Sequence, residues 1–183
     1  LTADEHRRRK LEADFWTAAF FWPMPKGTRW APTFAEFLRL RQQGPKALPA
    51  DRLLEVEALA KQVRFFHWHL EFPDVFGEDG PGGFDAVLGN PPWERIKLED
   101  KEFFDEKAPH VVAARTAALR RKATEELAQS NPALYRAYQR ALRSSDTVGG
   151  YLRRSHRYPH LSGDINTYQV FAELVRQIIS PIG

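Results

Sequence analysis

Three segments at the start of the chain have the residue patterns of α-helices. Thr2 to Phe21 begins with a residue type that caps helices, carries acidic residues in its first turn, and is followed by prolines. Thr33 to Gln43 has threonine and glutamate at the spacing of a capping box, and Gly44-Pro45 ends it. In Asp51 to Gln62 the apolar residues recur at helical spacing. We therefore expect residues 1–62 to form a helical N-terminal segment.

Two shorter segments have the residue patterns of β-strands. The stretch from Val63 to Leu70 is rich in aromatic and β-branched residues, and Pro73 closes it. After a glycine-rich loop, Phe84 to Gly89 is a short apolar run interrupted only by Asp85, which is typical of a buried parallel strand. We therefore expect strands near residues 64–70 and 84–89.

The rest of the chain returns to helical patterns. Asn131 and Pro132 are the residue types that favour an N-cap and a first helical position, and Gly149-Gly150 is expected to break the chain. Ser162-Gly163-Asp164 is expected to lead into a last helix. Four further helices are thus expected, over residues 99–106, 111–129, about 131–143, and about 168–178.

Composition narrows the class of protein. The chain has 183 residues, 13% of them aromatic, which suits one domain, or a piece of a larger protein, with its aromatic side chains buried. It has no cysteine, so disulfides and thiolate metal sites are excluded, and a cytoplasmic location is expected. No apolar run approaches the ~20 residues of a membrane helix, so no membrane partner is expected. The net charge of +3 permits a polyanionic partner without requiring one.

The tetrapeptide Asn90-Pro91-Pro92-Trp93 directly follows the second predicted strand. In open α/β sheets, ligands bind at the carboxyl ends of the strands. Pro91 and Pro92 have a fixed φ and no N–H, and each holds the residue before it in an extended conformation. We therefore expect the Pro91 carbonyl and the Asn90 side chain to form a rigid pair of hydrogen-bond acceptors.

A planar amine with two N–H donors, such as the exocyclic amine of adenine, fits such a pair of acceptors. The two oxygens would hold the amine in line with an electrophile and stabilise the positive charge that develops on its nitrogen. Trp93 would stack on a base that has flipped out of a duplex. The alternative is an ordinary Asn-Pro-Pro turn followed by a core tryptophan. The apolar run before the turn and the tryptophan directly after it favour the catalytic interpretation.

At these residues the sequence resembles a known family. The run from Phe84 to Trp93 resembles the catalytic motif of S-adenosylmethionine-dependent DNA methyltransferases that methylate amino groups. With Glu94 and Lys101 to Phe104, it is similar to the large enzymes of bacterial restriction–modification and phage-defence systems. Phe66 to Phe76 and Gly163 to Phe171 resemble the segments that flank the motif in those enzymes. The resemblance covers roughly residues 63–183.

The resemblance implies a fold and a set of roles. The fold would be α/β, a mostly helical chain containing part of a Rossmann-like methyltransferase sheet, with residues 63–183 as a partial catalytic domain and a helical insertion at about 97–160. The enzyme would methylate N6 of adenine in double-stranded DNA with S-adenosylmethionine as cofactor. The catalytic residues would be Asn90, Pro91, Pro92 and Trp93. His67 matches a position where relatives have an acidic residue that contacts the adenine of the methyl donor, and a packed histidine is the alternative.

One feature of the family is missing from the sequence. The family binds its cofactor through a glycine-rich loop between a strand and a helix, whereas the glycines at 77, 80, 82 and 83 open no helix. We therefore expect the main cofactor loop, and the rest of the parent polypeptide, to lie outside this chain, and the chain to be inactive alone. The two predicted strands would lack neighbours, so we expect the chain's own helices, the parent polypeptide or a homodimer to cover them.

Other candidate sites compete with this interpretation. His67, His69 and Glu71 could form a metal triad on one face of a strand, and Asp74, Glu78 and Asp79 resemble part of a nuclease site that lacks its lysine. Basic residues on the predicted helices are expected to form solvated faces, and the alternative is contact with the DNA backbone. The better phosphate candidates precede the last helix: Arg153, Arg154, His156 and Arg157.

Two other functions remain open. The chain could be a non-catalytic helical module for DNA binding or assembly, in which the motif is only a turn. It could also belong to an enzyme that methylates a protein glutamine, but that family typically has tyrosine where Trp93 stands and lacks the long helical insertion.

Overall fold

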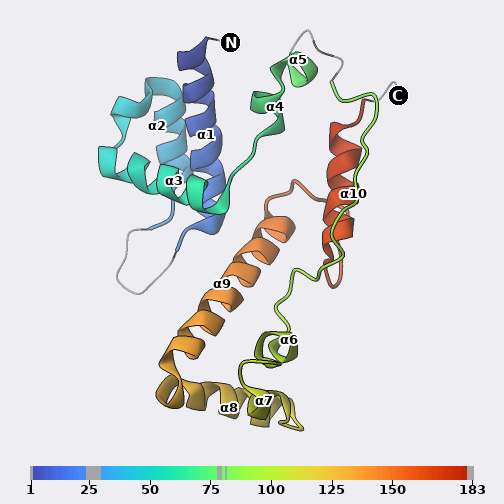
Figure 1. Cartoon of the computed structure of the whole chain (residues 1–183). Coiled ribbons are helices and arrows are strands. Elements are labelled where there is room, and N and C mark those ends of the chain that lie inside the picture. The colour runs from blue at the N-terminus through green and yellow to red at the C-terminus, as the bar shows by residue number, and fades with distance from the viewer. Residues whose placement is uncertain (1, 24–29, 78–79, 81, 181–183) are drawn as a thin grey trace. The chain divides into compact units, whose positions relative to one another are not determined.

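The computed structural model describes residues 2–23, 30–77, 80 and 82–180, and the chain divides into two compact units (Figure 1). The first unit joins the residues up to Asn90 to those from Phe171 onward, and the second unit consists of Pro91–Val170. The division predicted after residue 62, and the insertion at about 97–160, stay predictions.

The predicted N-terminal helices are confirmed. Thr2 caps the first of them by accepting a hydrogen bond from the Glu5 N–H at 3.3 Å. Thr33 and Glu36 form the predicted capping box, in which each side chain accepts from the other residue's backbone N–H. The helical elements of this region are α1 (Ala3–Phe21), α2 (Phe34–Gln43), the 3-10 turn η1 (Pro45–Ala47) and α3 (Ala50–Val63).

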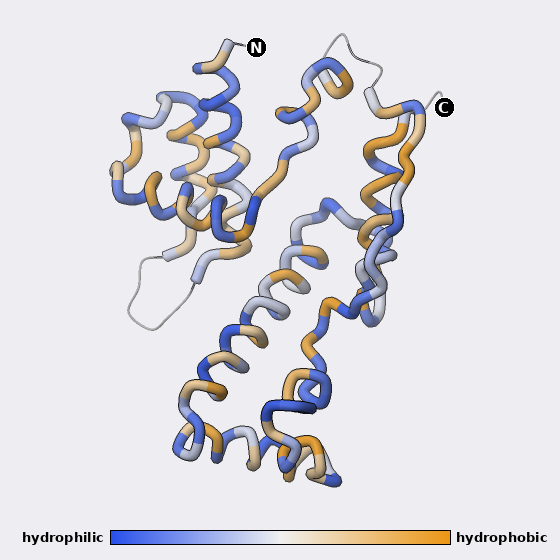
Figure 2. Tube along the Cα trace, in the orientation of Figure 1, coloured by the Kyte–Doolittle hydropathy of each residue, from blue (hydrophilic) through white to orange (hydrophobic). Residues whose placement is uncertain are grey.

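The apolar sides of α1, α2 and α3 enclose one hydrophobic core. Phe15, Leu40 and Val56, one from each helix, are fully buried at its centre. Apolar and polar residues alternate along these helices in Figure 2, as expected of helices that pack on one side and face water on the other. Burial of these three side chains contributes about 1.5–3 kcal/mol each to the stability of the first unit.

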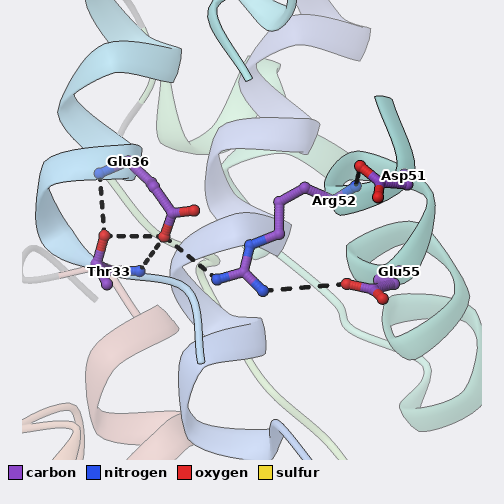
Figure 3. A network of polar contacts seen from close by, with 5 residues as sticks. All are labelled: Thr33, Glu36, Asp51, Arg52 and Glu55. Carbon is purple, nitrogen blue, oxygen red and sulfur yellow. Dashed lines mark hydrogen bonds and ion pairs between the residues drawn. The ribbon is translucent and has the colours of Figure 1, made fainter. Parts of the chain in front are cut away.

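A buried arginine joins α3 to α2 (Figure 3). The Arg52 side chain is 5% exposed, and its Nη2 lies 3.2 Å from Glu36 Oε2. The same carboxylate oxygen accepts from the Thr33 N–H at 2.8 Å. The Arg52 guanidinium also lies 4.6 Å from the ring centroid of Trp22. The Glu36 carboxylate therefore belongs to both the capping box and the ion pair, and the Arg52 guanidinium belongs to both the ion pair and the cation–π contact.

The strand predicted near residues 64–70 is absent. Arg64 has a left-handed conformation (φ 64°) and ends α3, and the helix α4 (Trp68–Glu71) follows three residues later. His67 starts that turn by accepting from the Leu70 and Glu71 N–H groups. Aromatic residues favour strands only where a neighbouring strand pairs with them. Here local hydrogen bonds and ring packing take the place of such a partner.

The strand predicted near residues 84–89 is also absent, so the α/β prediction is wrong for the described chain, which contains helices and two isolated bridges but no strand. Phe84 alone pairs, donating to the Ile178 carbonyl at 2.8 Å and accepting from the Ser180 N–H at 2.9 Å. Leu88 is 98% exposed. A strand needs a ladder of partners along its length, and within the described residues this segment has one at its first residue only.

Aromatic side chains explain why Phe84 is held where it is. Its ring lies 5.9, 5.3 and 5.4 Å from the ring centroids of Trp68, Phe72 and Phe76, each time edge to face. Trp68 and Phe72 belong to α4 and its end, and Phe76 ends α5 (Pro73–Phe76). Trp68, from the first predicted strand, and Phe72 and Phe76, which follow it, thus form an aromatic cluster around the start of the second predicted strand.

The second unit contains a second helical group. Two sequence predictions fail here. The predicted helix at 111–129 is divided in two, and Gly149-Gly150 lies inside a helix that continues to Arg154. The N-cap role predicted for Asn131 is confirmed, since its side chain accepts from the Leu134 N–H at 3.1 Å. The helices are α6 (Asp100–Phe104), α7 (Pro109–Val112), α8 (Ala117–Ser130) and α9 (Pro132–Arg154), and α10 (Thr167–Ile178) begins in this unit.

The core of the second unit lies between α6, α7, α8 and α9. Phe104, Val111 and Leu127 are buried at its centre. Tyr138 packs on Phe104 and donates its hydroxyl to Asp100 Oδ1 at 2.7 Å. Burial and that carboxylate raise the pKa of Tyr138, so the phenol remains protonated and can donate across the physiological range. Among the described residues, no helix is long and apolar enough to cross a membrane.

We predict that Arg52→Ala destabilises the first unit by about 3 kcal/mol, because it leaves the Glu36 carboxylate partly buried without its cation and removes the contact with Trp22. Urea unfolding followed by circular dichroism measures the change. The matched control is Arg39→Ala, an exposed residue of α2, which is expected to change stability by less than about 0.5 kcal/mol. Equal effects of the two substitutions would contradict the role of the buried arginine.

Candidate functional site

The Asn90-Pro91-Pro92-Trp93 loop lies outside the regular elements. Asn90 is the last residue of the first unit before Pro91 begins the second. The side chain of Asn90 is exposed, and that of Pro91 is partly buried. In the part of the chain that the structure describes, neither the Asn90 side chain nor the Pro91 carbonyl has a hydrogen-bond partner. Both are therefore available as acceptors for a ligand.

The hydroxyl of Thr167 holds the end of this loop. It donates to the Pro92 carbonyl at 2.6 Å and accepts from the Glu94 N–H at 2.9 Å. The Thr167 N–H in turn donates to the Glu94 carbonyl at 2.9 Å. Three hydrogen bonds therefore connect the residues on either side of Trp93 to the first residue of α10.

The hydroxyl of Ser145 repeats this arrangement four residues further along. It donates to the Ile96 carbonyl at 2.7 Å and accepts from the Leu98 N–H at 2.9 Å. Between the two hydroxyls, the Ile96 N–H donates to the carbonyl of Ile165 at 3.0 Å. Residues 92–98 are thus held by two helix side chains together with backbone hydrogen bonds to Ile165 and Thr167, which form a single bridge between Arg95 and Asn166 and not a strand. We call Thr167 and Ser145 the hydroxyl clamps.

The start of α10 is itself fixed by reciprocal hydrogen bonds. The Asn166 side chain accepts from the Tyr168 N–H at 3.3 Å, and the Gln169 side chain accepts from the Asn166 N–H at 2.8 Å. This is the pattern of a capping box. It places Thr167 at a defined position, so the clamp on the loop is preorganised.

Trp93 is exposed and has one aromatic neighbour. Its ring centroid lies 5.3 Å from that of Tyr168, with the two planes tilted by 33°. The Trp93 side chain is 73% exposed and Tyr168 is 40% exposed. A large apolar ring in water, on a backbone held on both sides, is suited to stacking on a planar ligand.

His67, the predicted cofactor contact, is buried. Only 3% of its surface is exposed, and its Nε2 lies 2.8 Å from Asp14 Oδ1. Lys10 Nζ lies 2.9 Å from the other oxygen of the same carboxylate. His67 thus connects the start of α4 to α1, and its role toward a cofactor stays a prediction.

The metal candidates are not brought together in the described residues. His67 is buried while His69 is exposed, so the shared strand face expected for the triad does not exist. No group of three potential metal ligands is found within the described ranges. Glu78 and Asp79, two of the predicted nuclease carboxylates, lie outside the described residues.

The predicted phosphate-binding arginines have different surroundings. Arg153 and Arg154 end α9 rather than lying in a loop. Arg153 donates to the carbonyls of Gly149 and Gly163, at 3.4 and 3.3 Å. Arg157 Nη1 lies 3.3 Å from the Tyr151 hydroxyl. Their role in DNA binding stays a prediction.

The hydroxyl clamps were missed by sequence reasoning. Thr167 lies in the segment that resembles the family, Gly163 to Phe171, and a threonine at the start of a predicted helix was the available signal. Ser145 had no such signal, because a serine inside a helix usually faces solvent or its own backbone.

In a comparison with protein families, the chain matches the model described as Eco57I restriction-modification methylase over residues 34–152. The match spans α2 to α9 and includes the Asn90-Pro91-Pro92-Trp93 loop and Ser145. Searches of curated proteins and of solved structures gave no match.

We predict that acid unfolding of the first unit depends on Asp14. Burial opposes ionisation of Asp14, but hydrogen bonds with His67 and Lys10 outweigh it and hold its pKa below the usual 3.8. The unfolded chain then binds the proton more readily, so the stability that Asp14 contributes is present above the usual pKa and is lost as pH falls through the folded value.

The test compares thermal unfolding of the unaltered chain and Asp14→Asn between about pH 7 and pH 2. The substitution should lower the midpoint at neutral pH and make its decline in acid shallower. Asp105→Asn, at an exposed position, is the control. Parallel curves for Asp14→Asn and the unaltered chain would contradict the assignment.

We also predict that Thr167→Val loosens the Asn90-Pro91-Pro92-Trp93 loop. Valine has the shape of threonine without the hydroxyl, so the Pro92 carbonyl and the Glu94 N–H lose their shared partner. A loss of about 1 kcal/mol corresponds to roughly fivefold faster hydrogen exchange of the Glu94 amide, measured by NMR. Thr167→Ser keeps the hydroxyl and should preserve slow exchange, and an unchanged rate in the valine variant would refute the clamp.

Proposed function

Because the chain belongs to the Eco57I restriction-modification methylase family, we propose that it forms the base-binding part of a DNA methyltransferase acting on N6 of adenine. The family membership supports the role in DNA methylation. Beyond that role, we propose that the target is adenine, that the enzyme functions in restriction–modification or phage defence, and that it is located in the cytoplasm.

The unoccupied acceptors at Asn90 and Pro91 carry the proposal. An exocyclic amine offers two N–H donors, and two fixed oxygens accept them without further rearrangement. As the amine nitrogen attacks a methyl group, it gains positive charge, which those oxygens stabilise. The Pro92 carbonyl already accepts from Thr167, so part of its capacity is taken. The two free acceptors, the Asn90 side chain and the Pro91 carbonyl, are therefore adjacent in the motif. The Pro92 carbonyl, next to Trp93, is bound to Thr167.

Trp93 supplies the surface on which a flipped adenine rests. Stacking a base on an aromatic side chain contributes roughly 1–3 kcal/mol, similar to the few kcal/mol needed to unstack the base from the duplex. The exposed ring supported by Tyr168 suits this role. The loop would thus bind the base and orient its amine.

The residues described in this chain do not fit a complete S-adenosylmethionine site. Gly77 ends α5 and opens no helix. Gly83 packs against the backbone of Ile179 and Ser180, which leaves no room there for a ligand. His67 is buried against Asp14. Because enzymes of this family generally use S-adenosylmethionine, we propose that the main cofactor loop is supplied by polypeptide outside these residues.

We predict that Asn90→Ala lowers the rate of methyl transfer by about 100-fold or more, because it removes one of two groups that stabilise the reacting amine. The measurement is transfer of labelled methyl to DNA by the enzyme that contains this chain together with its cofactor loop. Duplex affinity is measured in parallel and should be unchanged. Gln129→Ala, an exposed position of α8, is the control.

Trp93 provides the second arm of the same experiment. Trp93→Phe keeps an aromatic face and should retain most of the activity that Trp93→Ala loses. Full activity of Asn90→Ala would refute catalysis by this loop and leave the helical DNA-binding or assembly module as the function. Transfer to protein glutamine in place of DNA would refute the substrate class.

A further inference from the structure

One side of α9 presents a row of arginines. Arg136 and Arg154 are 18 residues apart, which is five helical turns, and Arg140 and Arg143 fall between them at helical spacing. All four side chains are exposed. The row extends for about 27 Å along the helix axis. We call these four residues the arginine stripe.

The arginine stripe lies opposite the buried side of α9. Three residues mark that side. Tyr138 donates to Asp100 of α6, and Ser145 donates to the Ile96 carbonyl. Leu152 is buried. All three are displaced from the stripe by about half a turn. Hydrophilic and apolar stretches alternate along α9 in Figure 2. The fold of the second unit therefore leaves this side of α9 uncovered by α6.

The positive charge of the arginine stripe is not neutralised by the helix that carries it. Asp146 is the single acidic residue of α9, and it lies about a quarter turn away from the stripe. In the described part of the chain, none of the four arginines forms an ion pair. On α1, by contrast, Arg8, Arg9 and Lys10 are each paired with a carboxylate.

Two glycines precede the last arginine of the stripe, and the Arg154 side chain lies over one of them. The two glycines Gly149 and Gly150 cost α9 about 1 kcal/mol each relative to alanine. A Cβ on Gly150 would collide with the guanidinium of Arg154, which lies back along the helix toward the other stripe residues. Arg153 lies against Gly149 instead, on the side that bonds to the Gly163 carbonyl.

We propose that the arginine stripe binds the phosphate backbone of duplex DNA. The proposal rests on the proposed function, which makes duplex DNA the substrate. Guanidinium groups pair with phosphate oxygens through two parallel hydrogen bonds, and B-DNA has a phosphate on each strand for every 3.4 Å of axis. A rigid helix with four unpaired arginines over about 27 Å can contact several phosphates of one groove edge.

Fluorescence anisotropy of the whole chain with a 30-base-pair duplex, titrated at several salt concentrations, tests the proposal. The stripe variant carries Arg→Gln at 136, 140, 143 and 154. Its control carries glutamine at four exposed basic positions of the first unit: Arg7, Arg39, Lys46 and Lys61. Both variants lower the net charge from +3 to −1, so they differ only in where the charge is removed. Glutamine keeps helix propensity, and circular dichroism checks the fold.

The stripe variant should lose at least tenfold in affinity at low salt, and the slope of log affinity against log salt should fall by about 0.9 for each phosphate contact removed. The control should lose less than threefold. Equal losses in the two variants, an unchanged stripe variant, or no duplex binding by the unaltered chain would each overturn the proposal. Asn90→Ala separates the two proposals, because it abolishes methyl transfer in the parent enzyme while binding through the stripe persists.

Discussion

Two side-chain hydroxyls hold the segment on which the candidate site is built. Residues 92–98 lie outside the helices, so their backbone groups need other hydrogen-bond partners. Thr167 and Ser145 each satisfy a carbonyl and the N–H two residues later, which is what an adjacent strand would do at those positions. Both hydroxyls come from helices. Together with the backbone hydrogen bonds to Ile165 and Thr167, they fix the segment although the described chain forms no sheet.

The helical part of the fold could be predicted because its signals are local. Thr33 with Glu36, and Asn131 with Pro132, act through groups three or four residues away, and the structure confirms them. Strands depend on distant partners, and the apolar run from Phe84 onward indicates only that a partner is needed. In the described chain, residues Ile178 to Ser180 provide such a partner, but only for Phe84. Gly149-Gly150 gave a wrong prediction for a related reason. Glycine disfavours a helix only weakly, and the packing of α9 outweighs that preference.

The sequence identifies the residues of the candidate site but not the side chains that hold them in place. The motif from Asn90 to Trp93 consists of consecutive residues, so it can be identified from the sequence without a structure. Thr167 is 75 residues from its acceptor Pro92, and Ser145 is 49 residues from Ile96. No periodicity connects positions so far apart. The partners of His67 and Arg52 were hidden in the same way, since Asp14 and Glu36 become neighbours only through helix packing.

The two prolines decide which atoms of the loop can be tethered and which stay free. Pro91 and Pro92 have no N–H, so the first amides that can be bound after Asn90 are those of Trp93 and Glu94. Thr167 takes the Glu94 amide and, with the same oxygen, the Pro92 carbonyl. A clamp of this reach does not extend to the Pro91 carbonyl or to the Asn90 side chain. The loop is thus held immediately beside the Asn90 side chain and the Pro91 carbonyl, and both keep their full capacity to accept hydrogen bonds.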